Sequence, residues 1–409
     1  MSIYDKLNEP QREAVYHTDG PLLILAGAGS GKTRVLTHRI AYLIGERGVN
    51  PWNILAITFT NKAAEEMRQR VDNLVGFGAE SVWVSTFHSA CVRILRRFID
   101  RLGYENHFTI YDTDDQKTLI KEVCRKVDVD TKVFKERSLL SAISSAKNEM
   151  ILPDEFELNA GGDFAKMKIA KVYREYEAQM RANNALDFDD LLVKTVQLLQ
   201  TQPDVLESYQ ERFRYIMVDE YQDSNNKQDY IFKLLSHNSY DGKTDTLTYG
   251  DNIFLVGDVK QSIYRFRLAN PQNFLRAIQS STPYQIQSKT PVQHIKLNQN
   301  FRSALSILNF VNTIFSNLMT PDCGDLYYDQ QQYLMKGTSI YDDLPQSIQG
   351  VEVVFLSDSE DAMDQANYVA QQIELLLAQQ TPVATAIGTR PCEPRDFCIL
   401  VRNGEPGKA

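Results

Sequence analysis

Short apolar runs alternate with amphipathic segments along the first two thirds of this chain. Five runs have the length of strands, and their continuous apolar character is typical of strands buried on both faces. They are residues 21–26, 54–57, 82–85, 215–218 and 253–256. The segment after the first run has helical periodicity, with Val35, Ile40 and Leu43 on one face. This alternation predicts an α/β fold built on a parallel sheet.

A loop of small residues separates the first run from the helix that follows it. The loop contains Gly27, Ala28, Gly29, Ser30 and Gly31, and Lys32 and Thr33 come next. Its glycines allow successive backbone N–H groups to converge on phosphate oxygens, where the helix N-terminus adds a partial positive charge. We therefore predict a nucleotide-binding P-loop, in which Lys32 reaches the phosphates and the Thr33 hydroxyl binds Mg²⁺. Ala26 replaces the first glycine of the usual pattern but keeps a small residue there.

Two further strand ends carry groups that suit phosphoryl transfer to water. The run 215–218 ends in Asp219 and Glu220. After a P-loop, the first acid of such a pair is expected to hold Mg²⁺ and the second to polarise the attacking water. Acid pairs at strand ends are common, so this prediction depends on the P-loop. Gln261 follows the run 253–256 closely enough to sense a terminal phosphate.

Aromatic and polar residues also follow these strands. Phe59 can stack on a base while Thr60 and Asn61 contact phosphates, although a role for Phe59 in the core stays open. His88, which follows Thr86, is more often a structural histidine, but beside the Thr60 loop it can contact a nucleic-acid backbone. Further along, Tyr264, Phe266 and Arg267 offer two stacking surfaces and a cation.

From about residue 106 to 185, buried strands disappear and helical periodicity dominates. The predicted helices are 113–126, 138–149 and 164–181. We interpret this part as a helical insertion that returns to the α/β domain through residues 186–192. The acids Asp187, Asp189 and Asp190 there suggest either a metal site or a helix cap, and the cap is favoured, which leaves Phe188 as the residue of interest.

The last part of the chain predicts a second α/β unit that starts at the strand-to-helix junction 295–303. The expected elements are a helix at 304–318, a strand at 351–356, a helix at 361–379 and a strand at 397–401. These are too few strands to close a sheet. The predicted domains are residues 1–105 and 186–293 for the ATP-binding domain, 106–185 for the insertion and 294–409 for the incomplete second domain.

Composition narrows the cellular context. The five cysteines are scattered without a CxxC pair, which argues for reduced thiols and against a disulfide framework or a zinc site. No apolar run approaches the roughly 18 residues that cross a bilayer, and the N-terminus does not look like a secretory leader, so we expect a cytoplasmic protein. The net charge of −9 gives no support for nucleic-acid binding, which must therefore rest on local patches.

Several segments then occur in a characteristic order. They are LNxxQ, AGAGSGKT, TFTNKAAEEM, STFHS, LDFDDLL, VDEYQDSN, VGDxKQSIYxFR and NFRS. With them the chain resembles the superfamily 1 DNA helicases of the UvrD/Rep/PcrA type. From Gly250 onward it looks more like the AddA helicase–nuclease subunit. The resemblance implies a RecA-like P-loop NTPase domain with the start of a second one. It also implies ATP- and Mg²⁺-dependent 3′-to-5′ movement on single-stranded DNA and duplex junctions, in repair or recombination.

The resemblance also implies roles for individual residues. Gln11 would read adenine, with Arg34 and Phe301 packing against the base. Gln261 and Arg302 would contact the terminal phosphate, with Arg302 reaching over from the second domain. Lys32 would serve the phosphates and Glu220 would be the catalytic base. The positions on the family's DNA track are Phe59, Asn61, Thr86, His88, Phe188, Tyr264, Phe266 and Arg267.

The family's later motifs have no counterpart before Ala409. We therefore expect a complete nucleotide-binding domain and an incomplete motor. Two interpretations follow: the N-terminal motor portion of a helicase, or a module that holds ATP and DNA with negligible turnover. The module would be a truncated product or one part of a split enzyme that needs a partner subunit or the rest of the motor. A P-loop enzyme acting on small molecules would leave the TFTN, STFH and QSIYRF segments without a purpose.

Overall fold

The computed structural model describes nine stretches of the chain. They are residues 2–76, 78–237, 240–241, 246–264, 269–285, 292–345, 350–356, 362–385 and 387–401. The chain divides into two compact units. The first consists of Met1–Ala26 and Lys32–Leu297, and the second of Gly27–Gly31 and Asn298–Ala409.

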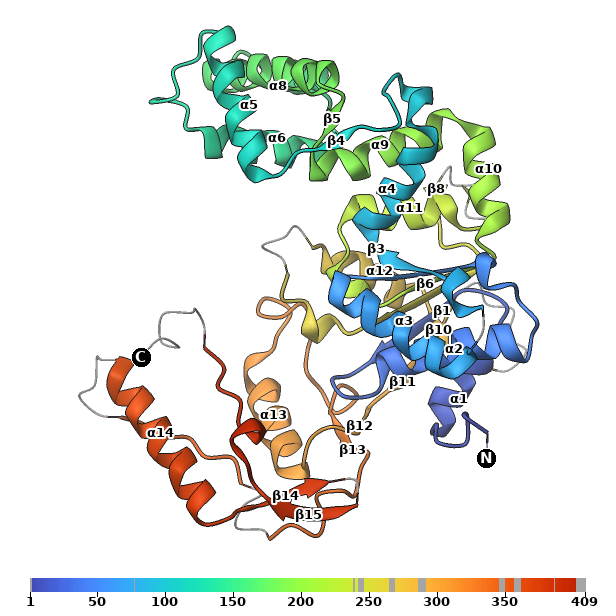
Figure 1. Cartoon of the computed structure of the whole chain (residues 1–409), viewed down its shortest axis with the longest axis vertical. Helices are drawn as coiled ribbons and strands as arrows, with labels where there is room; N and C mark the ends of the chain where they lie inside the picture. Colours follow the sequence, from blue (N-terminus) through green and yellow to red (C-terminus); the bar gives the residue numbers. More distant parts are fainter. Residues whose placement is uncertain are drawn as a thin grey trace. The chain divides into compact units, whose positions relative to one another are not determined.

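A seven-stranded sheet forms the centre of the first unit, in the order β10-β11-β1-β9-β6-β2-β3 (Figure 1). Its strands are β1 (Leu22–Ala26), β2 (Ile54–Thr58), β3 (Trp83–Thr86), β6 (Tyr215–Val218), β9 (Ile253–Gly257), β10 (Thr282–Pro283) and β11 (Gln293–Leu297). Every neighbouring pair is parallel, so all seven strands end at the same edge of the sheet. The five apolar runs of the sequence are β1, β2, β3, β6 and β9, which confirms the predicted α/β fold.

Helices bury their apolar faces against this sheet and against each other. The helices are α1 (Glu9–Tyr16), α2 (Lys32–Gly45), α3 (Asn61–Val75), α4 (Phe87–Phe98), α9 (Phe188–Thr201), α10 (Pro203–Arg212), α11 (Asn226–Leu235) and α12 (Pro271–Gln279). Five 3₁₀ turns accompany them: η1 (Pro51–Asn53), η2 (Ala79–Ser81), η3 (Ile99–Leu102), η4 (Tyr221–Asp223) and η5 (Val259–Gln261). On α2, Val35, Ile40 and Leu43 are fully buried, as the periodicity predicted. A short pair, β7 (Tyr240–Asp241) and β8 (Thr246–Leu247), lies ahead of β9.

The helical insertion leaves and rejoins this unit through a short parallel pair, β4 (Thr109–Ile110) and β5 (Ala185–Leu186). Its helices are α5 (Thr113–Lys126), α6 (Glu136–Asn148), α7 (Pro153–Asn159) and α8 (Phe164–Ala182). They pack around a core of their own that includes Ile120, Tyr173 and Tyr176. The three predicted helices are confirmed to within two residues at each end. The helix α7 was not predicted from the sequence, because seven residues are too few to show a helical period.

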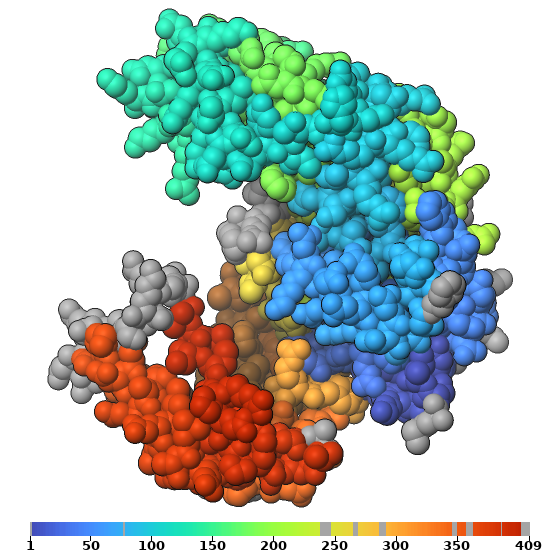
Figure 2. Space-filling model, in the orientation of Figure 1, coloured from blue at the N-terminus to red at the C-terminus, as the bar shows by residue number. Residues whose placement is uncertain are grey.

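The described part of the second unit contains helices and two small sheets. The elements are β12 (Gln299–Asn300), α13 (Leu305–Leu318), β13 (Met335–Lys336), α14 (Ala362–Ala378), β14 (Pro382–Thr385), β15 (Gly388–Pro391) and the 3₁₀ turn η8 (Pro394–Asp396). β12 pairs with β13, and β14 forms an antiparallel pair with β15. The described residues of this unit from Asn298 onward are coloured orange to red in Figure 2. The predicted helices 304–318 and 361–379 are confirmed as α13 and α14.

Two predicted strands of the second unit are wrong. Residues 351–356 and 397–401 have no strand assignment, and Phe355 and Leu400 are 90% and 91% exposed. An apolar run becomes a strand only when a neighbour completes its backbone hydrogen bonds, and these two runs have no such neighbour among the described residues. The strand expected to open the second unit is β11, which instead pairs with β1 in the first sheet. The pattern of the sequence shows that a strand is present but not which sheet takes it.

Within the described residues, no helix is both long enough and apolar enough to cross a membrane.

Candidate functional site

Three of the predicted side chains meet at the carboxyl edge of the large sheet. Lys32, at the start of α2, donates hydrogen bonds to Glu220 Oε2 at 2.8 Å and to Gln261 Oε1 at 2.8 Å. Glu220 follows β6, and Gln261 ends η5, which follows β9. Because β1, β9 and β6 are neighbours in the sheet, residues far apart in sequence end side by side. This edge therefore gathers a cation, an acid and an amide around one point.

Asp219 and Thr33 lie at the same edge. Thr33 Oγ1 donates to Asp219 Oδ2 at 3.2 Å, and the Asp219 carboxylate is buried. Burial, and then the charge of Glu220, raises the pKa of Asp219 to about 6. Among the described residues no group of three or more His, Cys, Asp or Glu side chains could hold a metal ion. One hydroxyl and one carboxylate do fit Mg²⁺, which keeps several waters and takes substrate phosphates as further ligands.

Glu220 adopts an unusual backbone conformation. Its φ of 51° and ψ of 44° lie in the left-handed region, which costs a residue other than glycine of the order of 1–3 kcal/mol. Such strain persists where the surroundings fix it, and here it turns the carboxylate toward Lys32. Strained residues of this kind cluster at active sites, which supports a functional reading of this acid.

Gln222 connects this acid to the next strand. Its Nε2 donates to Glu220 Oε2 at 2.8 Å, and its Oε1 accepts from the backbone N–H of Asp258 at 3.0 Å. The side chain is buried, and Gly257 leaves room for it, because a Cβ there would lie 2.6 Å from Gln222 Oε1. Gln222 was not among the residues predicted from the sequence. The available signal was an amide, able both to donate and to accept, two residues after the acid.

The P-loop residues Gly27–Gly31 belong to the second unit, where they contact the segment around Asn300. Asn300 Nδ2 donates to Ala28 O at 2.7 Å, and the Phe301 N–H donates to Gly29 O at 2.9 Å. Gly29 has a φ of 68°, and a Cβ there would lie 2.6 Å from Asn300 Nδ2. Glycine is therefore required at 29 by both backbone and space. Asn300 also accepts from the Arg302 N–H at 2.8 Å, so it joins the loop to the predicted arginine. Asn300 was not predicted from the sequence.

The residues predicted around the adenine have defined surroundings. Gln11 is only 2% exposed and forms a capping box with Asn8, whose Oδ1 accepts from the Gln11 N–H at 3.0 Å. Gln11 Oε1 in turn accepts from the Asn8 N–H at 3.1 Å. Arg34 on α2 and Phe301 are exposed. Their roles toward a base stay predictions.

The predicted DNA-track residues form two aromatic pairs. The rings of Phe59 and Tyr264 lie with centroids 4.9 Å apart, and His88 meets Phe188 edge-on at 5.8 Å. Phe188 is 52% exposed, while Phe59 and Tyr264 are partly exposed and thus not sealed in the core. Burial lowers the pKa of His88. Phe266 and Arg267 lie outside the described residues.

Several polar residues of the predicted track also cap helices. Thr60 accepts from the Ala63 N–H at 3.1 Å to cap α3, and the buried Thr86 accepts from the Ser89 N–H at 3.3 Å to cap α4. Asn61 is the exposed first residue of α3.

The acidic segment at the start of α9 also caps a helix. Asp187 and Asp190 form a capping box at the start of α9, with the Asp190 N–H donating to Asp187 Oδ1 at 2.8 Å. This confirms the helix-cap interpretation of the acidic segment.

Comparison with known proteins places these features in one family. Residues 7–282 match the UvrD/REP helicase N-terminal domain. The chain is 49% identical over 311 residues to the ATP-dependent DNA helicase PcrA of Bacillus subtilis (strain 168), covering 76% of this chain and 39% of that protein. It is 48% identical over 316 residues to proteins of the same name from Staphylococcus epidermidis (strain ATCC 12228 / FDA PCI 1200) and Staphylococcus aureus (strain Mu50 / ATCC 700699), covering 77% of this chain and 41% and 40% of theirs.

The chain thus spans about two fifths of the length of these relatives. A match over this much of the sequence, on a sheet edge that assembles the P-loop lysine with an acid pair, shows that the chain belongs to the UvrD/REP helicase family.

Proposed function

We propose that this chain is the N-terminal motor portion of an ATP-dependent DNA helicase that moves 3′ to 5′ along single-stranded DNA. The observation that carries the proposal is the joining of Lys32 to both Glu220 and Gln261, at the edge where Phe59 and Tyr264 also lie. Relatives at 48–49% identity bear the name ATP-dependent DNA helicase, which supports the same chemistry here. We also propose that it acts on duplex junctions in repair or recombination, and that it is located in the cytoplasm.

The proposed ATP site divides the work of hydrolysis among the named side chains. Lys32 neutralises charge on the terminal phosphate, and Glu220 orients the attacking water and accepts its proton. Thr33 and Asp219 would hold Mg²⁺, which would offset the negative charge of the phosphates. Gln261 would sense the terminal phosphate, and Arg302 would stabilise the charge that develops on it. Gln11, Arg34 and Phe301 are proposed to hold the adenine.

The proposed DNA track uses stacking surfaces rather than a basic patch. Aromatic rings bind bases of any sequence, each contributing about 1–3 kcal/mol. Phe59 with Tyr264 and His88 with Phe188 provide two such surfaces in the first unit. We assign Thr60, Asn61 and Thr86 to the DNA backbone, together with Phe266 and Arg267 as further track residues.

A second interpretation is a module that binds ATP and DNA without appreciable turnover. One observation favours it: the described part of the second unit has only two small two-stranded sheets. In this case a partner subunit, or the remainder of a longer motor, would supply the missing phosphate contacts. For either interpretation, we propose the domain limits 1–105, 106–185, 186–293 and 294–409.

ATP hydrolysis with and without single-stranded DNA separates the two interpretations. We expect oligo(dT) to raise the hydrolysis rate, with an affinity that falls as salt rises because phosphate contacts release counterions. We expect Phe59→Ala to raise the DNA concentration for half-maximal stimulation by about 5- to 150-fold, since it removes a stacking ring. Trp52→Ala is the matched control, because η1 precedes β2 and Trp52 therefore lies at the opposite edge of the sheet. Binding of ATP and DNA without stimulated hydrolysis would favour the module, and equal effects of the two substitutions would contradict the track.

Gln222→Ala tests whether Gln222 positions Glu220, the proposed catalytic base. The variant loses the hydrogen bond from Nε2 to Glu220 and the link to Asp258, so we expect kcat to fall about tenfold, or about 1.4 kcal/mol, with the KM for ATP little changed. Steady-state phosphate release measures both constants. Gln200→Ala is the control, because that exposed amide makes a hydrogen bond to Tyr230 Oη on the protein surface. A kcat for Gln222→Ala within twofold of wild type would show that Glu220 does not need this support.

A further inference from the structure

The first turn of α9 presents the exposed ring of Phe188 between two carboxylates. Asp187 precedes the ring and caps the helix, while Asp189 follows it. The edge of His88 contacts the ring, but Phe188 remains 52% exposed. Because a ring this exposed has few packing contacts of its own, its position depends on how firmly the backbone on both sides is held.

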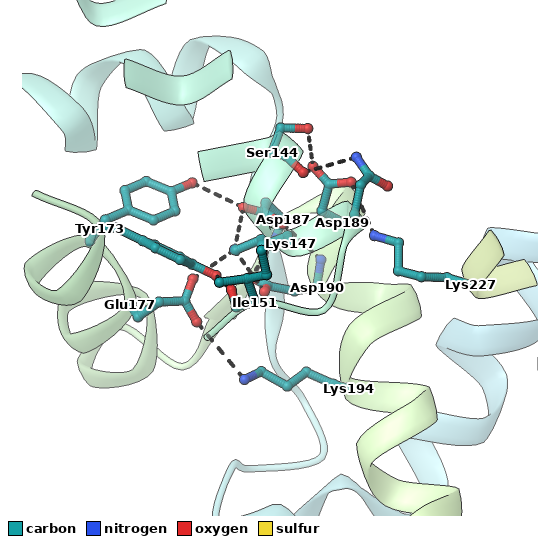
Figure 3. A network of polar contacts seen from close by, with 12 residues as sticks. Ser144, Lys147, Ile151, Tyr173, Glu177, Asp187, Asp189, Asp190, Lys194 and Lys227 are labelled. Carbon is teal, nitrogen blue, oxygen red and sulfur yellow. Dashed lines mark hydrogen bonds and ion pairs between the residues drawn. The ribbon is translucent and has the colours of Figure 1, made fainter. Parts of the chain in front are cut away.

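One face of α6 in the insertion holds both flanking acids. Lys147 Nζ lies 2.8 Å from Asp187 Oδ2 and 2.7 Å from Asp190 Oδ1, and Ser144 Oγ donates to Asp189 Oδ2 at 2.6 Å. Ser144 and Lys147 are three residues apart, which places them on the same side of the helix. Figure 3 shows Lys147 among the carboxylates and Ser144 beside Asp189.

Asp189 also pairs with a lysine of α11, outside the insertion. Lys227 Nζ on α11 lies 3.5 Å from Asp189 Oδ1, and Figure 3 shows it approaching from another element than Ser144. α11 follows η4, the turn directly after Asp219 and Glu220. The turn that carries Phe188 is therefore fixed between the insertion and the segment that carries the proposed catalytic base.

The cluster around Lys147 is buried enough to be rigid. Lys147 is only 2% exposed and also pairs with Glu177 of α8 at 2.7 Å, while Lys194 lies 3.9 Å from Glu177. Burial, and then the charge of Asp187, raises the pKa of Asp190 to about 8. Buried pairs of this kind lose much when their geometry changes, because water cannot replace the partner.

We propose that Ser144 and Lys147 are positioning residues for Phe188, so that the helical insertion sets where this ring meets a base of single-stranded DNA. This inference rests on the proposed function, because it assigns the ring a stacking role. The insertion then contributes to DNA binding without a DNA contact of its own at this point. A shift of α6 would change DNA affinity through the two acids that flank the ring.

A double-mutant cycle on the full chain tests this proposal. Ser144→Ala and Lys147→Met are each made with Phe188 present and with Phe188→Ala, and the dissociation constant for labelled oligo(dT) is measured by fluorescence anisotropy. We expect each substitution to weaken binding by about two- to tenfold when Phe188 is present, and to have no further effect in the Phe188→Ala background. The KM for ATP should stay the same. Lys126→Met is the control, because it removes the Lys126–Glu175 pair at 2.5 Å elsewhere in the insertion.

The outcomes separate the inference from the proposed function. An equal loss of affinity with and without Phe188 would overturn the inference, because the two residues would then act on the whole fold. Unchanged affinity in Ser144→Ala and Lys147→Met, with Phe188→Ala weakened, would overturn it too. If Phe188→Ala and Phe59→Ala both bind DNA like wild type, the proposed track itself is wrong. Ser144→Ala leaves the buried lysine in place, so the test holds even if Lys147→Met does not fold.

Discussion

Glu220→Gln is expected to bind ATP with nearly wild-type affinity and to hydrolyse it about 10²- to 10⁴-fold more slowly. Glutamine keeps the shape of the side chain and an oxygen that can accept from Lys32 and from Gln222. It loses only the negative charge and the ability to take a proton from the attacking water. Phosphate release in the presence of oligo(dT) measures the rate, and binding of a fluorescent ATP analogue measures the affinity.

A surface substitution of the same chemistry is the control for this result. Glu211→Gln on α10 removes an exposed carboxylate and should leave both rate and affinity unchanged. A fall of less than tenfold in the Glu220 variant would contradict its assignment as the base, since other groups would then activate water equally well. A loss of ATP binding in that variant would instead point to a structural role for the Lys32–Glu220 pair.

Lys147→Met is expected to lower the free energy of unfolding by about 3–5 kcal/mol, because Asp187, Asp190 and Glu177 would remain near each other without their shared cation. Urea unfolding followed by circular dichroism measures this change. The largest loss should fall on the insertion, where hydrogen exchange of α6 and α8 should accelerate.

Lys126→Met is again the matched comparison. Lys126 and its partner Glu175 are more exposed, so this substitution should cost about 0–1 kcal/mol. Replacing Asp190 with asparagine in the Lys147→Met background should recover part of the loss, since it removes one of the competing carboxyls. Equal destabilisation by the two lysine substitutions would show that the buried cluster does not stabilise the insertion.

The strands and the P-loop could be predicted because their signals are local. A buried run such as 215–218 shows its continuous apolar character within a few residues, and the GKT segment carries its chemistry in consecutive positions. The meeting of Lys32, Glu220 and Gln261 followed from one rule, that parallel strands present their carboxyl ends at one edge. Strand order itself was not needed for that prediction.

The parts that could not be predicted depend on partners far away in sequence. Gln222 meets Asp258 across 36 residues and Ser144 meets Asp189 across 45, and no local pattern indicates either contact. The apolar runs at 351–356 and 397–401 have the composition of strands, but a strand also needs a neighbour. The acids of the LDFDD segment could be predicted as caps, whereas the lysine that joins them could not.

The short chain distance between Gln261 and Tyr264 limits how the proposed nucleotide and polynucleotide sites would influence each other. Gln261 contacts the lysine of the P-loop, and three residues later Tyr264 packs on Phe59. If bound nucleotide raises the affinity for the polynucleotide by some factor, bound polynucleotide must raise the affinity for the nucleotide by the same factor, because linkage is reciprocal. Residues 261–264 can couple the two proposed sites within the first unit. Coupling at this edge therefore does not require the domains to close.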